Sequence, residues 1–194
     1  MAVKEYPVIW LQGASCTGCS VSVLNAVSPK IQNLLLDELV PGKQINMRFH
    51  MTIMAGEGES VINVLRDTQK QKKGEYVLIV EGAIPTASNG IYGTIGEEGD
   101  KPATILSRVE DLGRDALLTI ALGTCAAYGG IPSASPNPSG CKSVLEVFEE
   151  KNINPAANKN IKTINTFINL PMISDDESLI DEQVLVVWKD RGSL

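Results

Sequence analysis

Three short runs of this sequence are apolar almost throughout, and they restrict the fold more than any other feature. The runs cover residues 8–11, 76–80 and 116–122. A strand that is covered on both faces gives a continuous apolar run, whereas a strand with one solvated face alternates. Because fully covered strands belong to parallel sheets between layers of helices, the runs predict an α/β fold.

Helical patterns and turn residues separate these runs, as parallel strands require. Apolar residues at spacings of three and four indicate a helix over 20–39, which Pro29 should kink or split. The alternation of strands and helices predicts a doubly wound parallel sheet with right-handed crossovers. The further elements expected are strands over 45–51, 161–170 and 184–188, helices over 57–71, 103–112 and 142–151, a glycine-rich surface excursion over 89–100 with a hairpin through residues 91 and 92, and a loop over 126–140.

Length and charge exclude several classes of protein. A chain of 194 residues suits one domain that buries about 70% of the surface of its unfolded chain. The net charge of −6 and the pI near 4.9 argue against a nucleic-acid partner. No apolar run approaches the roughly 18 residues of a membrane span, so membrane association is not indicated. Segment 1–7 is too short and too charged for a signal peptide, and we therefore expect a cytoplasmic protein, or a periplasmic one if a leader was removed before residue 1.

A pair of cysteines, Cys16 and Cys19, follows the first apolar run directly. Two thiols at this spacing can bind one soft metal centre, because the turn between them brings both sulfurs to the same side. Taken alone, the pair is compatible with a zinc half-site, a thioredoxin-like redox pair or half of an iron–sulfur site. Four cysteines in this chain are few enough to be reduced thiols or ligands rather than a disulfide framework.

The predicted sheet brings further residues to the cysteine pair. Ligands of such sheets bind beyond the carboxyl ends of the strands, where the strand order reverses. The loops expected there are the cysteine pair, the segment that begins at Glu81, and the segment that runs from Gly123 to Cys125. Cys16, Cys19 and Cys125 are thus expected on one edge of the sheet.

This third cysteine changes the balance among the alternatives. Buried cysteines that act as small apolar residues would not need three thiols in adjoining loops. A thioredoxin-like pair leaves Cys125 without a role, and zinc needs four ligands in a chain with one histidine, His50. An iron–sulfur cluster held by thiolates is favoured. Glu81 fits either a solvated loop or a functional role, and we assign no role to His50.

The residues around these loops form several blocks that occur together in one known family. The blocks are 16–20 (CTGCS), 49–50 (FH), 54–55 (MA), 80–86 (VEGAIPT), 123–132 (GTCAAYGGIP) and 136–140 (PNPSG). In this order they resemble the small subunits of nickel–iron hydrogenases, most of all the uptake-type members. The likeness extends over residues 7–148.

This resemblance implies a flavodoxin-like, three-layer domain whose loops hold a proximal 4Fe–4S cluster. The cluster would face a large subunit that carries a nickel–iron centre, and the complex would oxidise dihydrogen reversibly. The role implied for this chain is electron transfer, onward to a further carrier protein. By the same match Cys16, Cys19 and Cys125 are metal ligands, and the residues expected beside the cluster are Gly18, Glu81, Gly123 and Thr124.

The sequence departs from the family pattern after residue 168. The family takes its fourth cluster ligand from an Asn-x-Pro-Gly-Cys-Pro-Pro segment, and Ile173 stands here in place of that cysteine. The alternatives are Cys141 as the fourth ligand or a site with three cysteines, for which a 3Fe–4S cluster is an option. We expect an iron–sulfur domain over 1–170 with a divergent extension over 171–194 packed on or near it, and no part that binds further clusters. The competing hypotheses are a non-catalytic iron–sulfur, scaffold or redox-sensing module and, less favoured, a flavin-binding protein.

Overall fold

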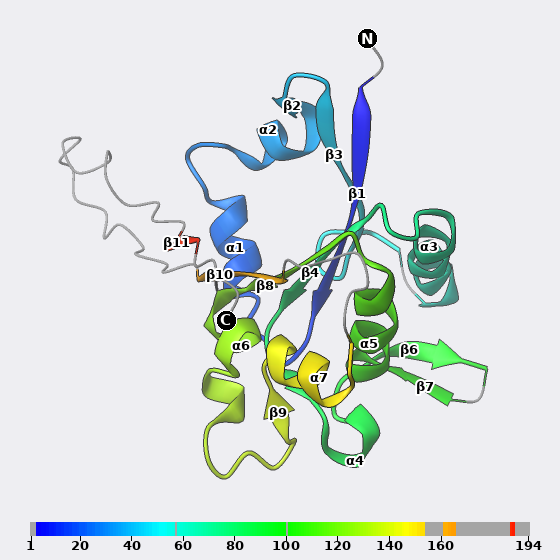
Figure 1. The fold of residues 1–194 in the computed structure, drawn as a ribbon, viewed down its shortest axis with the longest axis vertical. Coiled ribbons are helices and arrows are strands. Elements are labelled where there is room, and N and C mark those ends of the chain that lie inside the picture. The colour runs from blue at the N-terminus through cyan, green and yellow to red at the C-terminus, as the bar shows by residue number, and fades with distance from the viewer. Residues whose placement is uncertain (1–2, 57, 100, 154–160, 166–186, 189–194) are drawn as a thin grey trace, which may run out of the picture.

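One twisted sheet runs through the centre of the molecule (Figure 1). The computed structural model describes residues 3–56, 58–99, 101–153, 161–165 and 187–188. Five neighbouring strands are parallel, and the strand at each edge runs antiparallel to its neighbour. In order across the sheet, the strands are β11 (Val187–Trp188), β10 (Ile161–Asn165), β8 (Leu118–Leu122), β4 (Val77–Glu81), β1 (Lys4–Gln12), β3 (Lys43–His50) and β2 (Glu38–Val40).

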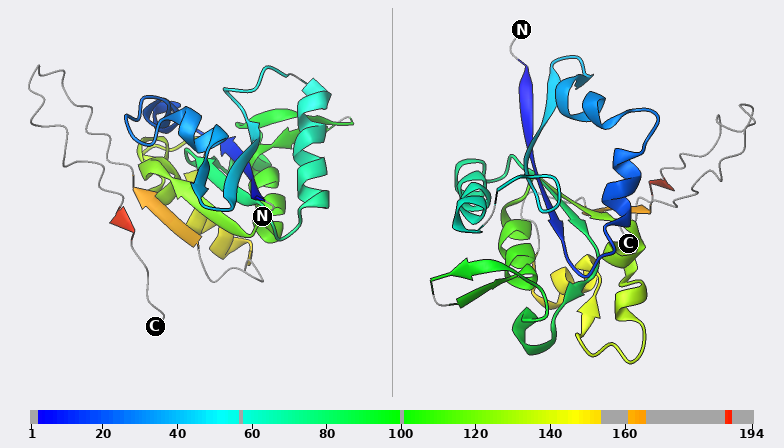
Figure 2. Two further views of the ribbon diagram at one scale, coloured as in Figure 1. Left: turned by 90° about the horizontal axis from the view of Figure 1, so that it is seen from above. Right: turned by 180° about the vertical axis from the view of Figure 1, so that it is seen from behind.

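Helices cover both faces of this sheet, which makes three layers (Figure 2). On one face, α3 (Gly58–Gln71) packs against β3 and α5 (Ile105–Asp115) packs against β1 and β4, while α1 (Gly18–Leu24) lies on the other face. The doubly wound, flavodoxin-like architecture predicted from the sequence is therefore confirmed. The helices are α1 (Gly18–Leu24), α2 (Ile31–Leu36), α3 (Gly58–Gln71), α4 (Ala87–Gly90), α5 (Ile105–Asp115), α6 (Gly123–Tyr128) and α7 (Val144–Glu150), with a 3₁₀ turn at Ile131–Ser133.

The predicted apolar strands form the centre of the core. Residues 8–11 of β1 are all buried, and so are Leu78 and Val80 of β4. Helix α5 adds Val109 and Leu112 from its inner face. Each such side chain contributes about 1.5–3 kcal/mol relative to an exposed position, so this layer holds in place the loops at the ends of the strands.

The helix expected over 20–39 is two short helices. Helix α1 ends at Leu24 and α2 begins at Ile31, with Pro29 in the connection between them. A proline cannot donate the backbone hydrogen bond that a continuous helix needs, so the predicted split is confirmed. The end of the expected helix instead forms β2, which pairs with β3.

Two segments differ from the elements expected. Part of the predicted loop over 126–140 belongs to α6, which starts directly at the end of β8. The predicted hairpin exists, but it is formed by β6 (Thr94–Glu98) and β7 (Lys101–Thr104) rather than through residues 91 and 92. A small antiparallel pair, β5 (Ile84–Pro85) with β9 (Cys141–Lys142), precedes α7 and was not predicted.

The C-terminal predictions are described only in part. Of the strand expected over 161–170 the structure describes β10, and of that over 184–188 it describes β11, which pairs with β10. The boundary expected at residue 170, the position of Ile173 and most of the extension lie outside the described residues. Within the described part of the chain, no helix is long and apolar enough to cross a membrane.

Candidate metal centre

The predicted juxtaposition of the three loops follows from the register of the sheet. Gln12 at the end of β1 pairs with Glu81 of β4, and Glu81 pairs in turn with Leu122 of β8. The three strands therefore end side by side, and the chain leaves the sheet at the same level each time. The cysteine loop, the loop after Glu81 and the start of α6 are thereby brought together, as expected.

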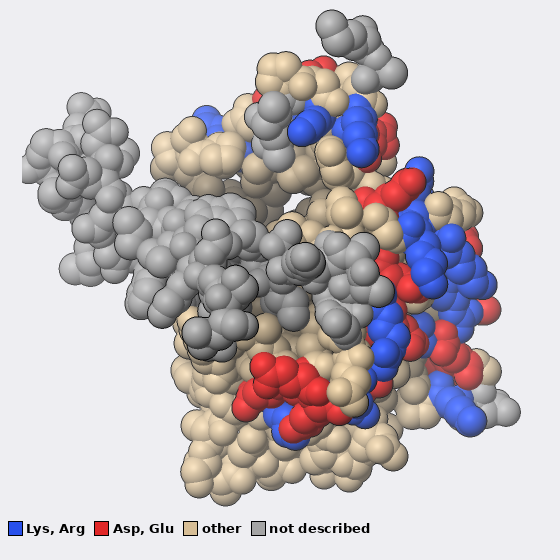
Figure 3. Space-filling view, viewed as in Figure 1, with Lys and Arg blue, Asp and Glu red and all other residues tan. Residues whose placement is uncertain are grey.

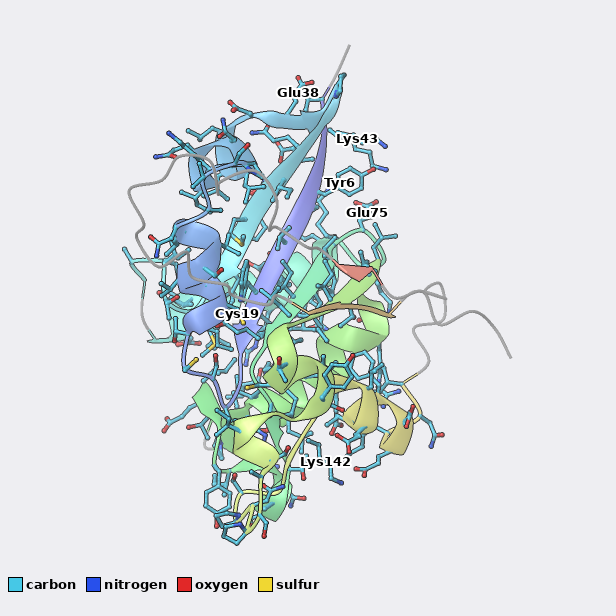
Figure 4. All side chains as sticks on the ribbon, turned by 90° about the vertical axis from the view of Figure 1, so that its left-hand side faces the viewer. Tyr6, Cys19, Glu38, Lys43, Glu75 and Lys142 are labelled. Atoms are coloured by element: carbon cyan, nitrogen blue, oxygen red, sulfur yellow. The ribbon has the colours of Figure 1, made fainter. Side chains whose placement is uncertain are left out.

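Hydrogen bonds join these loops to one another. The backbone N–H of Gly13 donates to the carbonyl of Glu81 at 2.8 Å, and Ala14 and Ala83 exchange two backbone hydrogen bonds of 2.7 and 3.1 Å. The thiol of Cys19 lies 3.8 Å from the carbonyl oxygen of Leu122. In Figure 4, Cys19 lies at the base of α1, close to the end of β1. The cysteine loop is thus fixed between the ends of two other strands.

A glycine lies against the sulfur of each of the three cysteines. A Cβ atom on Gly18 or Gly130 would come within 3.0 or 2.7 Å of the neighbouring sulfur, and one on Gly123 would overlap it. Gly123 and Gly130 also have positive φ angles, of 82° and 55°, which favour glycine. Space beside each sulfur is thus kept open by the absence of a side chain. The pairs are Cys16 with Gly18, Cys19 with Gly123, and Cys125 with Gly130.

The cysteines differ in exposure and in surroundings. Cys16 is exposed, whereas Cys19 and Cys125 are half-buried. Thr124, expected beside the cofactor, is exposed on the first turn of α6. Cys141 is 3% exposed in β9, where its thiol lies 3.2 Å from Ser139 Oγ. Its backbone is held on both sides by the Asn137 side chain, with hydrogen bonds of 2.7 and 3.0 Å.

Glu81 is buried, with only 1% of its surface exposed, so the solvated-loop alternative is wrong. Its carboxylate accepts six hydrogen bonds. Two come from the backbone N–H groups of Cys19 and Ser20 at 3.1 and 3.3 Å, in the first turn of α1. The side-chain donors are Trp10 Nε1 and Gln12 Nε2, both at 3.1 Å, Ser15 Oγ at 3.2 Å and Ser20 Oγ at 2.5 Å.

These hydrogen bonds decide the charge of the carboxylate. Burial acts to raise the pKa of Glu81, but the hydrogen bonds from Ser20, Gln12 and Trp10 outweigh it and hold the pKa below its ordinary value. Glu81 therefore carries a negative charge at neutral pH. A buried, fully hydrogen-bonded carboxylate thus lies next to the backbone of Cys19, one of the predicted ligands.

Sequence reasoning missed the partners of Glu81. Gln12 is a polar residue at the end of an apolar strand, and Ser20 follows Cys19 directly. His50, to which no role was assigned, is 2% exposed. Its ring lies tilted against that of Trp10, with 4.7 Å between the ring centroids, and its Nε2 lies 3.3 Å from Ser20 Oγ. The only signal was the presence of polar residues at the carboxyl ends of buried strands.

The donor set fits an iron–sulfur cluster better than a single ion. Among the described residues, no three side chains of His, Cys, Asp or Glu converge as ligands of one metal ion do. In a cluster each thiolate binds a different iron, so the sulfurs can stay further apart. Three cysteines with open space beside each sulfur meet that requirement.

Comparison with known proteins agrees with this site. The family described as NADH ubiquinone oxidoreductase, 20 Kd subunit, matches residues 16–172, which includes every cysteine of the chain. The chain belongs to this family. Within the family, the chain is similar to small subunits of nickel-containing hydrogenases, and the resemblance inferred from the sequence blocks is confirmed.

Two relatives show the extent of the likeness. The periplasmic NiFeSe hydrogenase small subunit of Desulfomicrobium baculatum is 45% identical over 155 residues, which cover 77% of this chain and 47% of that protein. The periplasmic NiFe hydrogenase small subunit 1 of Nitratidesulfovibrio vulgaris is 40% identical over 147 residues, or 76% of this chain and 43% of that protein. The chain thus spans about half the length of these family members.

A solved structure confirms the fold assigned to this chain. The reduced, active NiFeSe hydrogenase of Desulfomicrobium baculatum superimposes with a TM-score of 0.73 at 43% identity, covering 84% of this chain and 55% of that one.

The expectation about location is wrong. A cytoplasmic location is contradicted by the two relatives above, which are both described as periplasmic.

Proposed function

We propose that this chain is the electron-transfer subunit of a nickel–iron hydrogenase. In this role it relays electrons between the nickel–iron site of a large subunit and a further electron carrier during reversible oxidation of dihydrogen. The observation that carries the proposal is the arrangement of Cys16, Cys19 and Cys125 beyond the ends of three adjacent parallel strands, each sulfur against a glycine. The hydrogenase small subunits to which the chain is similar support it.

The three cysteines are the proposed ligands of a 4Fe–4S cluster. When bound, such a cluster accepts and releases one electron at a time. The glycines beside the sulfurs let the backbone approach the site closely, and hydrogen bonds from backbone N–H groups to cluster sulfurs raise the reduction potential. Helix α6 starts at Gly123 with no side-chain hydrogen bond from its N-cap residue. Its first N–H groups therefore suit this purpose.

Cys141 is a poor candidate for the fourth cluster ligand. Its thiol is buried against Ser139 and its backbone is held by Asn137 in the β5–β9 pair. We therefore propose three cysteine ligands within the described residues, with Cys141 as a structural residue. The pairing of β11 with β10 supports packing of the segment after residue 170 on the same domain.

The proposed surface for the large subunit surrounds the cysteine loops. On α1, Val21 and Leu24 are exposed apolar residues. Beside Cys125, Tyr128 is 55% exposed and Ile131 is 88% exposed. Segment 128–140 carries no charged residue, and the corresponding corner of the molecule, below α6, is uncharged in Figure 3. Large exposed apolar side chains next to an uncharged segment are typical of a protein–protein interface.

Anaerobic co-expression of the full chain with a large subunit tests this function. We expect iron and sulfide in the ratio of a 4Fe–4S cluster, an electron paramagnetic resonance signal after reduction, and hydrogen-dependent reduction of a dye. A complex that contains no iron beyond that of the large subunit would refute the proposal. A bound cluster without hydrogen-dependent dye reduction would favour the non-catalytic iron–sulfur module instead.

A further inference from the structure

A chain of hydrogen bonds leads from the metal centre to the surface through the only histidine of the protein. Glu81 is linked to Ser20 Oγ, Ser20 Oγ to His50 Nε2, and His50 Nδ1 to Thr52. The first three residues are at most 2% exposed, whereas Thr52 is exposed. A buried histidine in such a chain can either fill space or fix the direction of the hydrogen bonds.

The partners of His50 determine where its proton lies. The backbone N–H of Thr52 lies 3.3 Å from Nδ1, and a backbone N–H can only donate. Nδ1 must therefore accept, and the Thr52 hydroxyl at 3.1 Å is a second donor to the same atom. Burial lowers the pKa of His50, which keeps the ring neutral. In a neutral ring with Nδ1 as acceptor the proton is on Nε2, so His50 donates to Ser20 Oγ.

This donation decides what Ser20 does with its own proton. The Ser20 hydroxyl has two lone pairs and one hydrogen. It accepts from His50 Nε2 at 3.3 Å and from Gln12 Nε2 at 3.0 Å. With both lone pairs in use, its hydrogen is committed to Glu81 Oε2, at 2.5 Å. The same carboxylate accepts the backbone N–H of Cys19 through its other oxygen.

We infer that His50 is a positioning residue: through Ser20 it fixes the Glu81 carboxylate that holds the backbone of Cys19 in place. The inference does not require His50 to touch the cluster or to carry a proton. Its effect on a cluster rests on the proposed function, but the direction of the hydrogen bonds does not. If His50 only filled space against Trp10, a phenylalanine at position 50 would serve equally well.

The first experiment measures the tautomer without a mutation. The full chain is labelled with ¹⁵N-histidine, which gives a single imidazole because His50 is the only histidine, and is observed by nuclear magnetic resonance at neutral pH. We expect an unprotonated Nδ1 and a protonated Nε2. A proton on Nδ1, or a doubly protonated ring, would overturn the inference whether or not the chain binds a cluster.

The second experiment measures the reduction potential of the cluster in the complex. We expect His50→Phe and Ser20→Ala to raise the potential, because the negative charge of Glu81 is held less firmly near the site. Since His50 acts through Ser20, the double variant should shift the potential no further than Ser20→Ala alone. His50→Gln, whose Nε2 can donate to Ser20, should restore the parent value.

The outcomes of the two experiments separate the two proposals. Additive shifts in the double variant, or a His50→Phe potential equal to that of the parent, would show that His50 is only packed in the core. If the parent complex binds no cluster, the proposed function fails, and the tautomer measurement still decides the hydrogen-bond direction.

Discussion

The carboxylate of Glu81 caps the helix that begins beside Cys19. Its Oε1 atom accepts hydrogen bonds from the backbone N–H groups of Cys19 and Ser20, more than sixty positions earlier in the chain. The N-cap residue Thr17 provides no side-chain hydrogen bond of its own. A helix N-terminus needs acceptors for its first N–H groups and favours a negative charge. Strand β4 thus orders the cysteine loop through one side chain.

This cap makes the stability of the chain sensitive to acid through Glu81. Its pKa is lower in the folded chain than the ordinary value of 4.5, so its contribution is present above pH 4.5 and is lost as the pH falls through the lower, folded value. We expect Glu81→Gln to lower the free energy of unfolding by about 3 kcal/mol at pH 7. The NH₂ group of the glutamine would face the N–H and O–H donors that now bond to the carboxylate, so several of them would lose their acceptor. Urea titrations of both chains at several pH values should show this difference shrinking below pH 4.5, and a constant difference would contradict the assignment.

The contact between Gly123 and Cys19 predicts a substitution that affects the site more than the fold. In Gly123→Ala the new Cβ overlaps Cys19 Sγ, and the positive φ of 82° adds strain of about 1–2 kcal/mol. Gly42→Ala is the matched control, since its φ is 78° and nothing lies within 4 Å of its Cβ position. Both variants should lose the stability that the positive φ costs, and Gly123→Ala should lose somewhat more in denaturant titrations because of the overlap. Only Gly123→Ala should lose iron. Equal iron content in the two variants would show that the contact is not important.

The ligand assignment predicts opposite effects for two cysteines. Cys125→Ser should reduce the iron and sulfide content and stop electron transfer, with the sheet still folded by circular dichroism, because a serine hydroxyl is a poor ligand for iron–sulfur clusters. Cys141→Ser is the matched control and should retain iron, because that thiol lies in β9 against Ser139. Loss of iron from Cys141→Ser would identify Cys141 as the fourth ligand.

A further prediction tests the packing of α5 against α7. Gly113 of α5 lies against the ring of Phe148 of α7, and a Cβ there would lie 2.8 Å from one ring carbon and closer still to another. Gly113→Ala gains about 1 kcal/mol of helix propensity, but overpacking costs about 1–3 kcal/mol. We expect a lower midpoint of urea unfolding and unchanged iron content. Adding Phe148→Leu should recover part of the stability, and failure to do so would place the strain elsewhere.

The sheet and the position of the site could be predicted because both depend on local pattern. The continuous apolar runs that became β1, β4 and β8 require cover on both faces, and parallel strands bring their following loops to one edge. Pro29 alone was enough to predict the division between α1 and α2.

The rest depended on contacts that no local pattern contains. The start of α6 at Gly123 was missed because glycines and small residues suggest a loop, whereas the packing of the helix against β8 and β10 decides the outcome. The burial of Glu81 could not be derived either, because its six hydrogen bonds come from residues brought together only by the sheet. His50 gained its neighbours in the same way.

The shared level at which β1, β4 and β8 end also sets an order of events in the maturation of the protein. About a hundred residues separate Cys19 from Cys125, and the pairing of Gln12, Glu81 and Leu122 is what brings them together. An unfolded chain therefore offers a delivered cluster only the local pair Cys16 and Cys19. On the proposed function, cluster insertion should follow formation of the sheet. Because the folded chain offers more ligands than the unfolded one, the inserted cluster would then protect the chain against unfolding.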